Sequence, residues 1–145
     1  MFTHAATVFD RGEDGVYVES SAFTDMGVLV SAPPYARVRP DKREELLWIT
    51  VRQALESSGK RVPHPESWDG PFPLGQLAGC KNWKAFAEGA SYCMVCIEGD
   101  EIRFSSGEWD GRGFGPGDLP ETSLPADSSE VDLLARLNEY LGYGE

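Results

Sequence analysis

Short runs of β-branched and aromatic residues, each bounded by Gly, Asp or Pro, dominate the first forty positions of the chain. Residues 6–9, 16–20 and 27–31 have this composition, and a polar segment separates the first two runs. Such alternation is typical of strands joined by tight turns. Pro33 and Pro34 follow the third run, and they are expected to end its pairing because proline has no amide hydrogen to donate to a sheet.

Apolar residues then recur at helical spacing. Pro40 opens this segment, acidic residues follow it, and Leu47, Val51 and Leu55 fall on one face. Proline is favoured in the first turn of a helix, and acids are favoured near its amino end, where the helix dipole is positive. The spacing predicts a helix that begins near Pro40 and ends before Gly59.

The middle of the chain contains a proline-rich connector and a second, shorter helix. Four prolines lie within residues 62–73, and the segment is expected to be extended because proline fixes φ and excludes regular structure. Asn82 has the side chain of a helix N-cap, and Trp83, Phe86, Ala87 and Ala90 follow it at helical spacing. A short helix is therefore predicted from Trp83.

Two further strands are predicted after this helix. Residues 92–97 and 101–104 are apolar runs joined by Glu98-Gly-Asp100, and a two-residue Gly-Asp loop is a hairpin signal. Residues 105–125 contain five glycines and three prolines. That composition predicts a loop that holds at most one short strand.

The chain ends in a helix that is predicted from about residue 128 to residue 141. Asp127 and Glu130 stand three residues apart, as the partners of a capping box do. The apolar stripe that faces the core is expected to consist of Val131, Leu134, either Leu137 or Asn138, and Leu141.

Strands, a helix, strands and a helix follow one another along the chain, which indicates an α+β fold. We expect a mixed or antiparallel sheet with the two longer helices packed on one face. The 145 residues suffice for one core, so residues 1–145 are expected to form a single domain. The sequence does not determine the order of the strands.

Negative charge is concentrated in the last third of the chain. Residues 98–145 hold twelve carboxylates and three arginines, a balance of −9 within a whole-chain charge of −11. A field of one sign steers a partner of opposite sign, and it argues against direct binding of nucleic acid, whose phosphates need Lys and Arg. The expected partner is a basic protein, a cation or a metal. The alternative is that the acids only maintain solubility.

The cysteines indicate a reducing compartment. There are three, an odd number, and no basic segment followed by an apolar run opens the chain, so reduced thiols and a cytoplasmic location are expected. Cys93 and Cys96 have the C-x-x-C spacing of metal and redox pairs, but residues three apart on a strand point to opposite faces. They are therefore predicted to be core residues. No run is long enough to cross a membrane, and no membrane partner is expected.

Patterns that carry catalysis or bind metals are sparse. The two histidines, His4 and His64, have no neighbour arranged as a ligand or nucleophile, and no G-x-S-x-G elbow is present. The glycine run at residues 111–117 lacks the spacing and the lysine of a phosphate-binding loop, and the carboxylate clusters lack the spacing of a calcium loop. We therefore expect no catalytic residue, no cofactor and no metal site.

Glu108-Trp109-Asp110 differs from the other acidic clusters because a large aromatic side chain stands between two carboxylates. Tryptophan is enriched at the centres of interfaces, and flanking acids suit a basic surface. The alternative is that Trp109 packs back onto the core. The candidate residues for binding a basic protein are Glu98, Asp100, Glu101, Glu108, Trp109, Asp110, Asp118 and Glu121.

Four segments carry a family resemblance. They are Leu55-Glu-Ser-Ser-Gly-Lys-Arg-Val-Pro-His-Pro65, Leu77-Ala-Gly-Cys-Lys-Asn-Trp-Lys-Ala-Phe86, Ile102-Arg-Phe-Ser with Gly111-Arg-Gly-Phe114, and residues 128–141. Together they resemble the immunity proteins of contact-dependent growth inhibition systems in Gram-negative bacteria. The pattern there has a V-P-x-P connector, a G-x-K-S-W-x-x-F helix start, a strand end in Pro-Thr, a G-G-F stretch and a terminal helix. Here Asn82 replaces the Ser, and Ser105-Ser106 replaces the Pro-Thr.

The resemblance implies a non-enzymatic protein that binds and blocks the toxic C-terminal domain of a cognate effector, commonly a nuclease. It supplies no shared catalytic or toxin-facing residues, so the candidates above rest on charge and aromatic character alone. A monomer or weak dimer is expected. Two other functions stay open: an acidic adaptor for some other basic protein, and a small enzyme or ligand-binding domain. The latter would use a pocket beneath Trp68 and Trp83 in which His64, Asp69 and Cys80 converge.

Overall fold

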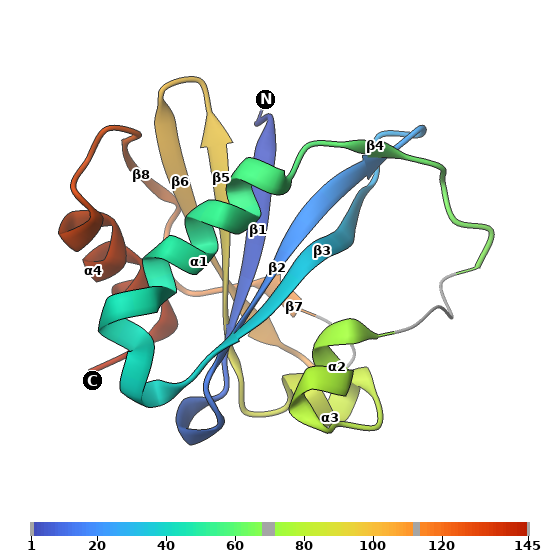
Figure 1. Cartoon of the computed structure of the whole chain (residues 1–145), viewed down its shortest axis with the longest axis horizontal. Helices are drawn as coiled ribbons and strands as arrows, with labels where there is room; N and C mark the ends of the chain where they lie inside the picture. Colours follow the sequence, from blue (N-terminus) through green and yellow to red (C-terminus); the bar gives the residue numbers. More distant parts are fainter. Residues whose placement is uncertain (1, 68–71, 112–113, 145) are drawn as a thin grey trace.

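One open β-sheet forms the centre of the protein (Figure 1). The structure is a computed structural model and describes residues 2–67, 72–111 and 114–144. Six strands follow the order β3-β2-β1-β5-β6-β7, while β4 pairs with β2, and β8 pairs with β6. The strands are β1 (His4–Asp10), β2 (Val16–Thr24), β3 (Leu29–Val38), β4 (Arg61–Val62), β5 (Ser91–Glu98), β6 (Glu101–Trp109), β7 (Phe114–Pro116) and β8 (Thr122–Pro125).

Two long helices lie over one face of the sheet, and two short helices pack against the other face. Figure 1 shows α1 crossing the sheet, α4 beside β5 and β6, and the short helices together at one end. The predicted α+β class, with a mixed or antiparallel sheet and both long helices on one face, is confirmed. The pairing is antiparallel among the described strands except for the short β2–β4 pair, which is parallel. The helices are α1 (Arg43–Ser57), α2 (Pro73–Ala78), α3 (Trp83–Ala87) and α4 (Glu130–Leu141), with 3-10 turns η1 (Gly12–Asp14) and η2 (Pro40–Lys42).

The main core lies between the long helices and the sheet. Leu47, Val51 and Leu55 of α1 are buried as their spacing predicts. They pack with Leu137 of α4 and with alternate residues of the strands, such as Phe104. Burying one aliphatic side chain of this size contributes about 1.5–3 kcal/mol, so this face holds much of the stability.

A second, aromatic core lies on the opposite face. Phe9 and Tyr17 point to this side because they alternate with the valines that face α1. They pack against Leu74 of α2 and Phe86 of α3, all four being at most 1% exposed. The two short helices therefore cover an aromatic cluster at one end of the sheet.

The local signals for the short helix and the hairpin are confirmed, except that α3 ends at Ala87 and does not reach Ala90. Asn82 Oδ1 accepts a hydrogen bond of 2.9 Å from the amide of Ala85, which is the predicted cap of α3. Glu98 pairs with Glu101 across the two-residue turn between β5 and β6. Cys93 belongs to the main core, whereas Cys96 is buried elsewhere, as expected for residues three apart on a strand.

The expectation that Pro33 and Pro34 end the pairing of the third strand is wrong. β3 continues to Val38, and its register with β2 moves from Ser20↔Ala32 to Glu19↔Tyr35, which skips both prolines. β3 is also the outermost strand on its side of the sheet. A bulge on an edge strand accommodates proline because no further strand needs its missing amide hydrogen.

The expectation of a loop over residues 105–125 is also wrong. β6 continues to Trp109, and β7 and β8 both pair with β6. Glycine and proline indicated a loop, but these short strands lie at the edge of the sheet, where both residues are tolerated. The helix α2 was likewise absent from the prediction, because only its first residue, Pro73, gives a helix signal.

The terminal helix begins and faces the core differently from the prediction. Ser129, not Asp127, is its N-cap, with Ser129 Oγ accepting a hydrogen bond of 3.1 Å from the amide of Asp132. Val131 is 76% exposed, so it does not belong to the inner stripe. The buried residues of α4 are Leu133, Leu137, Tyr140 and Leu141.

One buried arginine joins the two long helices to the sheet. Arg43, at the start of α1, is 4% exposed, and its Nη1 lies 2.7 Å from Asp10 Oδ2 at the end of β1. Its Nε and Nη2 donate hydrogen bonds of 3.0 and 2.8 Å to Asn138 Oδ1 of α4. The ring of Tyr143 covers the guanidinium at 3.6 Å. Charge-assisted hydrogen bonds of this kind have a fixed geometry, so they set the angle between the helices and the sheet.

We predict that Asp10→Ala lowers the free energy of unfolding by about 3–5 kcal/mol, because it leaves the Arg43 charge buried without its carboxylate. Glu45→Ala is the control, since Glu45 forms an exposed pair with Lys42 at 3.5 Å. That change should cost less than about 1 kcal/mol. Urea unfolding measures both, and equal losses in the two variants would contradict the role given to Asp10.

Candidate functional site

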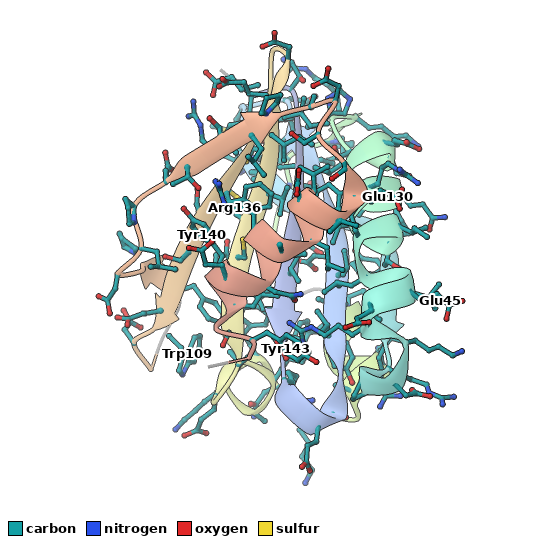
Figure 2. The ribbon with its side chains drawn as sticks, turned by 90° about the vertical axis from the view of Figure 1, so that its left-hand side faces the viewer. Glu45, Trp109, Glu130, Arg136, Tyr140 and Tyr143 are labelled. Carbon is teal, nitrogen blue, oxygen red and sulfur yellow. The ribbon has the colours of Figure 1, made fainter. Side chains whose placement is uncertain are left out.

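A groove of about 760 Å³ lies between the outer strands and the end of α4. Its walls come from three segments that are far apart in sequence: the start of β5, the end of β6 with residues 117–119, and the last turn of α4. Figure 2 labels Trp109 and Tyr140, which lie on this side of the molecule. The groove is therefore built by the fold rather than by one loop.

Glycine allows the walls of this groove to approach closely. A β-carbon at Gly107 would lie 2.5 Å from Cδ1 of Tyr92 on the paired strand, and one at Gly117 would lie 2.3 Å from Oγ of Ser106. Non-bonded contacts that short do not occur, so a side chain at either position requires the neighbouring atoms to move. Gly107 and Gly117 thus serve close packing, whereas Gly111 and Gly115 have open space where a side chain would be.

Trp109 lines the groove and is anchored from beneath by other aromatic rings. Its ring centroid lies 6.3 Å from that of Trp83 and 5.4 Å from that of Phe114, and both of these rings pack on the aromatic core. The side chain is half-buried. Trp109 therefore packs on the core, which was one alternative from the sequence. It also presents part of its surface to the groove, as the other alternative, an interface residue, requires.

The charged residues of the groove are all acidic within the described part of the chain. Glu108, Asp118 and Glu139 line it, and no described lining residue is Lys, Arg or His. The nearest cation on α4, Arg136, has its Nε 3.8 Å from Glu139 Oε2. Three carboxylates around a half-buried indole favour a cationic ligand surface.

Glu139, which α4 places at the groove, was not among the candidate residues predicted from the sequence. The available signal was that Glu139 lies on the polar side of a helix next to Tyr140, near the chain end. Only the packing of α4 against β5 and β6 shows that this position meets Glu108 and Asp118.

The remaining predicted residues do not all join the groove. Glu98, Asp100 and Glu101 lie at the β5–β6 turn, at the opposite end of β6 from Glu108. The rise of a strand places Glu101 about 23 Å from Glu108. Arg103 Nη1 lies 3.0 Å from Glu98 Oε2. The acids thus form two patches along one strand.

Glu121 and Asp110 lie between or beside these patches. Glu121 Oε1 accepts a hydrogen bond of 3.0 Å from Ser105 Oγ, and Glu121 Oε2 lies 4.0 Å from Arg103, in the middle of β6. Asp110 directly follows Trp109 at the end of β6 and is exposed. Neither residue lines the groove: Glu121 lies beside the middle of β6, and Asp110 lies just beyond its end.

A separate pocket of about 570 Å³ surrounds Glu19 on the aromatic side of the sheet. Tyr35, Phe72 and Trp83 contribute rings to its lining, and Ser31 donates a hydrogen bond to the Glu19 carboxylate. Burial raises the pKa of Glu19 from 4.5 to about 7, and the Ser31 hydrogen bond opposes this shift.

Two of the residues named for the catalytic alternative, His64 and Cys80, have other partners in the described structure. His64 Nδ1 lies 3.1 Å from Thr24 Oγ1, and Cys80 packs against the aromatic core. Trp68 and Asp69 lie outside the described residues. Over the described ranges, no three His, Cys, Asp or Glu side chains are placed to hold a metal ion together.

The two strand cysteines are unreactive thiols. Burial raises the pKa of Cys93 to about 12 and that of Cys96 to about 11. These side chains therefore stay protonated near neutral pH, and they are unreactive because the thiolate is the reactive species.

The described helices include none that is both long and apolar enough to cross a bilayer.

Solved structures share this fold, including the following two. One chain of the CdiA-CT/CdiI toxin and immunity complex from Yersinia pseudotuberculosis has a TM-score of 0.71 and 19% identity, covering 96% of this chain and 95% of that chain. A protein of unknown function from Neisseria meningitidis has a TM-score of 0.71 and 16% identity, covering 96% of this chain and 93% of that chain. No protein-family model and no curated protein matches the sequence. The likeness expected from the sequence is confirmed for the fold.

We predict that the stability of the protein depends on the ionisation of Glu19. The carboxyl ionises near pH 4.5 when unfolded and near pH 7 when folded, so unfolding releases a proton between these values. The contribution of Glu19 to the free energy of unfolding is therefore largest below about pH 4.5 and declines as pH rises to about 7. Glu19→Gln should be more stable than the native chain by on the order of 1–3 kcal/mol near pH 8, and nearly equal to it near pH 4.5.

Thermal or urea unfolding at the two pH values measures this difference. Glu56→Gln on α1 is the matched control, because Glu56 is exposed. A Glu19→Gln effect that is the same at both pH values would contradict the burial assigned to this carboxylate.

Proposed function

We propose that this chain is an immunity protein that binds and neutralises the toxic C-terminal domain of a cognate contact-dependent growth inhibition effector. The observation that carries the proposal is a shared fold over 96% of the chain with a component of a toxin and immunity complex. The four sequence segments that resemble such immunity proteins supply independent support.

The charge distribution supports the inhibitor role and a basic partner. Residues 98–145 carry −9, and the groove gathers Glu108, Asp118 and Glu139 around Trp109. A nuclease domain needs a cationic surface for its nucleic acid, and an acidic inhibitor can occupy or overlap that surface. We therefore infer that the partner is a basic domain, with nuclease activity as the expected toxic function.

The proposed interface centres on the groove and extends to the hairpin patch. Trp109 is the anchor, because a half-buried aromatic held by neighbouring rings loses little freedom on binding. The acids steer association and surround this anchor. The proposed toxin-binding residues are Glu98, Asp100, Glu101, Glu108, Trp109, Asp110, Asp118, Glu121 and Glu139.

The proposal places the protein in the cytoplasm, where a delivered toxin acts, as a monomer or weak dimer without a cofactor. It assigns the protein no enzymatic activity. Co-expression with the domain encoded by the gene directly upstream is the direct test. The two proteins should co-purify, and the chain should restore the growth of cells that produce that domain; toxicity unchanged by the chain would contradict the proposal.

We predict that charge reversal in the groove slows binding without unfolding the protein. Glu108→Lys with Asp118→Lys should lower the association rate constant for the toxin domain by about tenfold or more at low ionic strength and flatten its salt dependence. The melting temperature should change little, because both side chains are exposed.

The matched control is Asp25→Lys with Glu44→Lys, which makes the same change in net charge at exposed positions away from the groove. Stopped-flow kinetics at several salt concentrations separates the two pairs. Equal rates for both double variants would show that the total charge, and not the groove, governs association.

A further inference from the structure

The pocket at Glu19 is distinct from the acidic groove, and its lining points to a specific ligand. Glu19 lies in the middle of β2, level with Thr7 of β1 and Tyr35 of β3. The pocket volume of about 570 Å³ accommodates a long side chain with its flanking backbone. The pocket is therefore large enough for one side chain of a partner to contact Glu19.

The carboxylate of Glu19 has no cation among the described residues that line its pocket. Apart from Glu19 and the phenol of Tyr35, the lining consists of neutral side chains, mainly proline, valine and aromatic residues. Tyr92, whose ring packs on the aromatic core, also interacts with Glu19. A carboxylate that is desolvated without a cation destabilises the free protein, and a ligand cation would remove that cost.

The aromatic rings that line the Glu19 pocket suit a planar cation. Trp83, Tyr35 and Phe72 line the pocket, and indole and phenol faces attract a guanidinium group. The same protein already holds a guanidinium in this way, since Arg43 lies between the Asp10 carboxylate and the Tyr143 ring. The Glu19 pocket offers the same two components, a carboxylate and aromatic rings.

We infer that this pocket receives the guanidinium group of an arginine side chain from the protein partner, with Glu19 as the counter-ion and Trp83 and Tyr35 as stacking surfaces. The source of the arginine rests on the proposed function, which supplies a basic protein. Trp83 also contacts Trp109, which lines the groove. Trp83 is therefore the side chain that separates Trp109 from the Glu19 pocket, so a partner bound at Trp109 lies next to that pocket.

The first test compares binding of the upstream-encoded toxin domain to the native chain and to Glu19→Gln near pH 8. The dissociation constant of the variant should rise by about tenfold or more. Weaker binding cannot reflect unfolding, because Glu19→Gln is expected to be the more stable protein at this pH. Glu56→Gln, exposed on α1, is the control and should bind like the native chain.

Arginine-to-alanine substitutions in the toxin domain then identify the inserted residue. For the inserted arginine, the alanine substitution combined with Glu19→Gln should reduce the binding free energy by no more than either substitution alone. If the native chain and Glu19→Gln bind the toxin domain equally, the pocket inference is overturned and the proposed function stands.

A second test does not need the toxin. N-acetyl-arginine amide should shift the NMR signals of the Glu19 amide and the Trp83 indole at millimolar concentration, whereas the neutral isostere N-acetyl-citrulline amide should not. Glu19→Gln should remove the response. Equal shifts with both probes, or none with either, would overturn the inference. A specific response in a chain that binds no toxin domain would support the pocket and contradict the proposed function.

Discussion

The hydrogen-bonded ion pair between Arg43 and Asp10 is the interaction on which the arrangement of the molecule depends. Arg43 belongs to α1, Asp10 ends β1, and the same guanidinium is bound by Asn138 of α4. Gly142 ends α4 in a left-handed conformation with φ 71°, and the chain then turns so that Tyr143 covers Arg43. One buried charge thus fixes both long helices and the chain end relative to the sheet, because each partner must be in place to compensate its desolvation.

This arrangement leaves the two faces of the sheet with different roles. The long helices bury the apolar face, while the other face carries an aromatic cluster that α2 and α3 cover only at one end. The last turn of α4, positioned through Asn138, closes one wall of the groove that holds Trp109. Stability and the proposed recognition surface are therefore separated: the ion pair and main core hold the fold, and the acids and half-buried rings at the edge form the surface proposed to bind a partner.

Much of the fold followed from local patterns, whereas the site depended on packing. The α1 stripe, the Asn82 cap and the Gly-Asp hairpin are set by neighbouring residues, so the sequence predicted them correctly. β7 and β8 pair only with the distant β6, and composition alone indicated a loop there. Glu108, Trp109 and Asp118 were chosen for their chemistry, but Glu139 and the Glu19 pocket arise from segments that meet only in the folded protein.

Amide hydrogen exchange of the chain with and without the upstream-encoded toxin domain tests the central claim most directly. If an acidic, aromatic edge of this fold captures a basic domain, binding should slow exchange at the end of β6, in α3 and in the last turn of α4. The outer surface of α1 and the β2–β3 turn should exchange as in the free protein. Protection confined to α1 and that turn, or no protection anywhere, would contradict the claim.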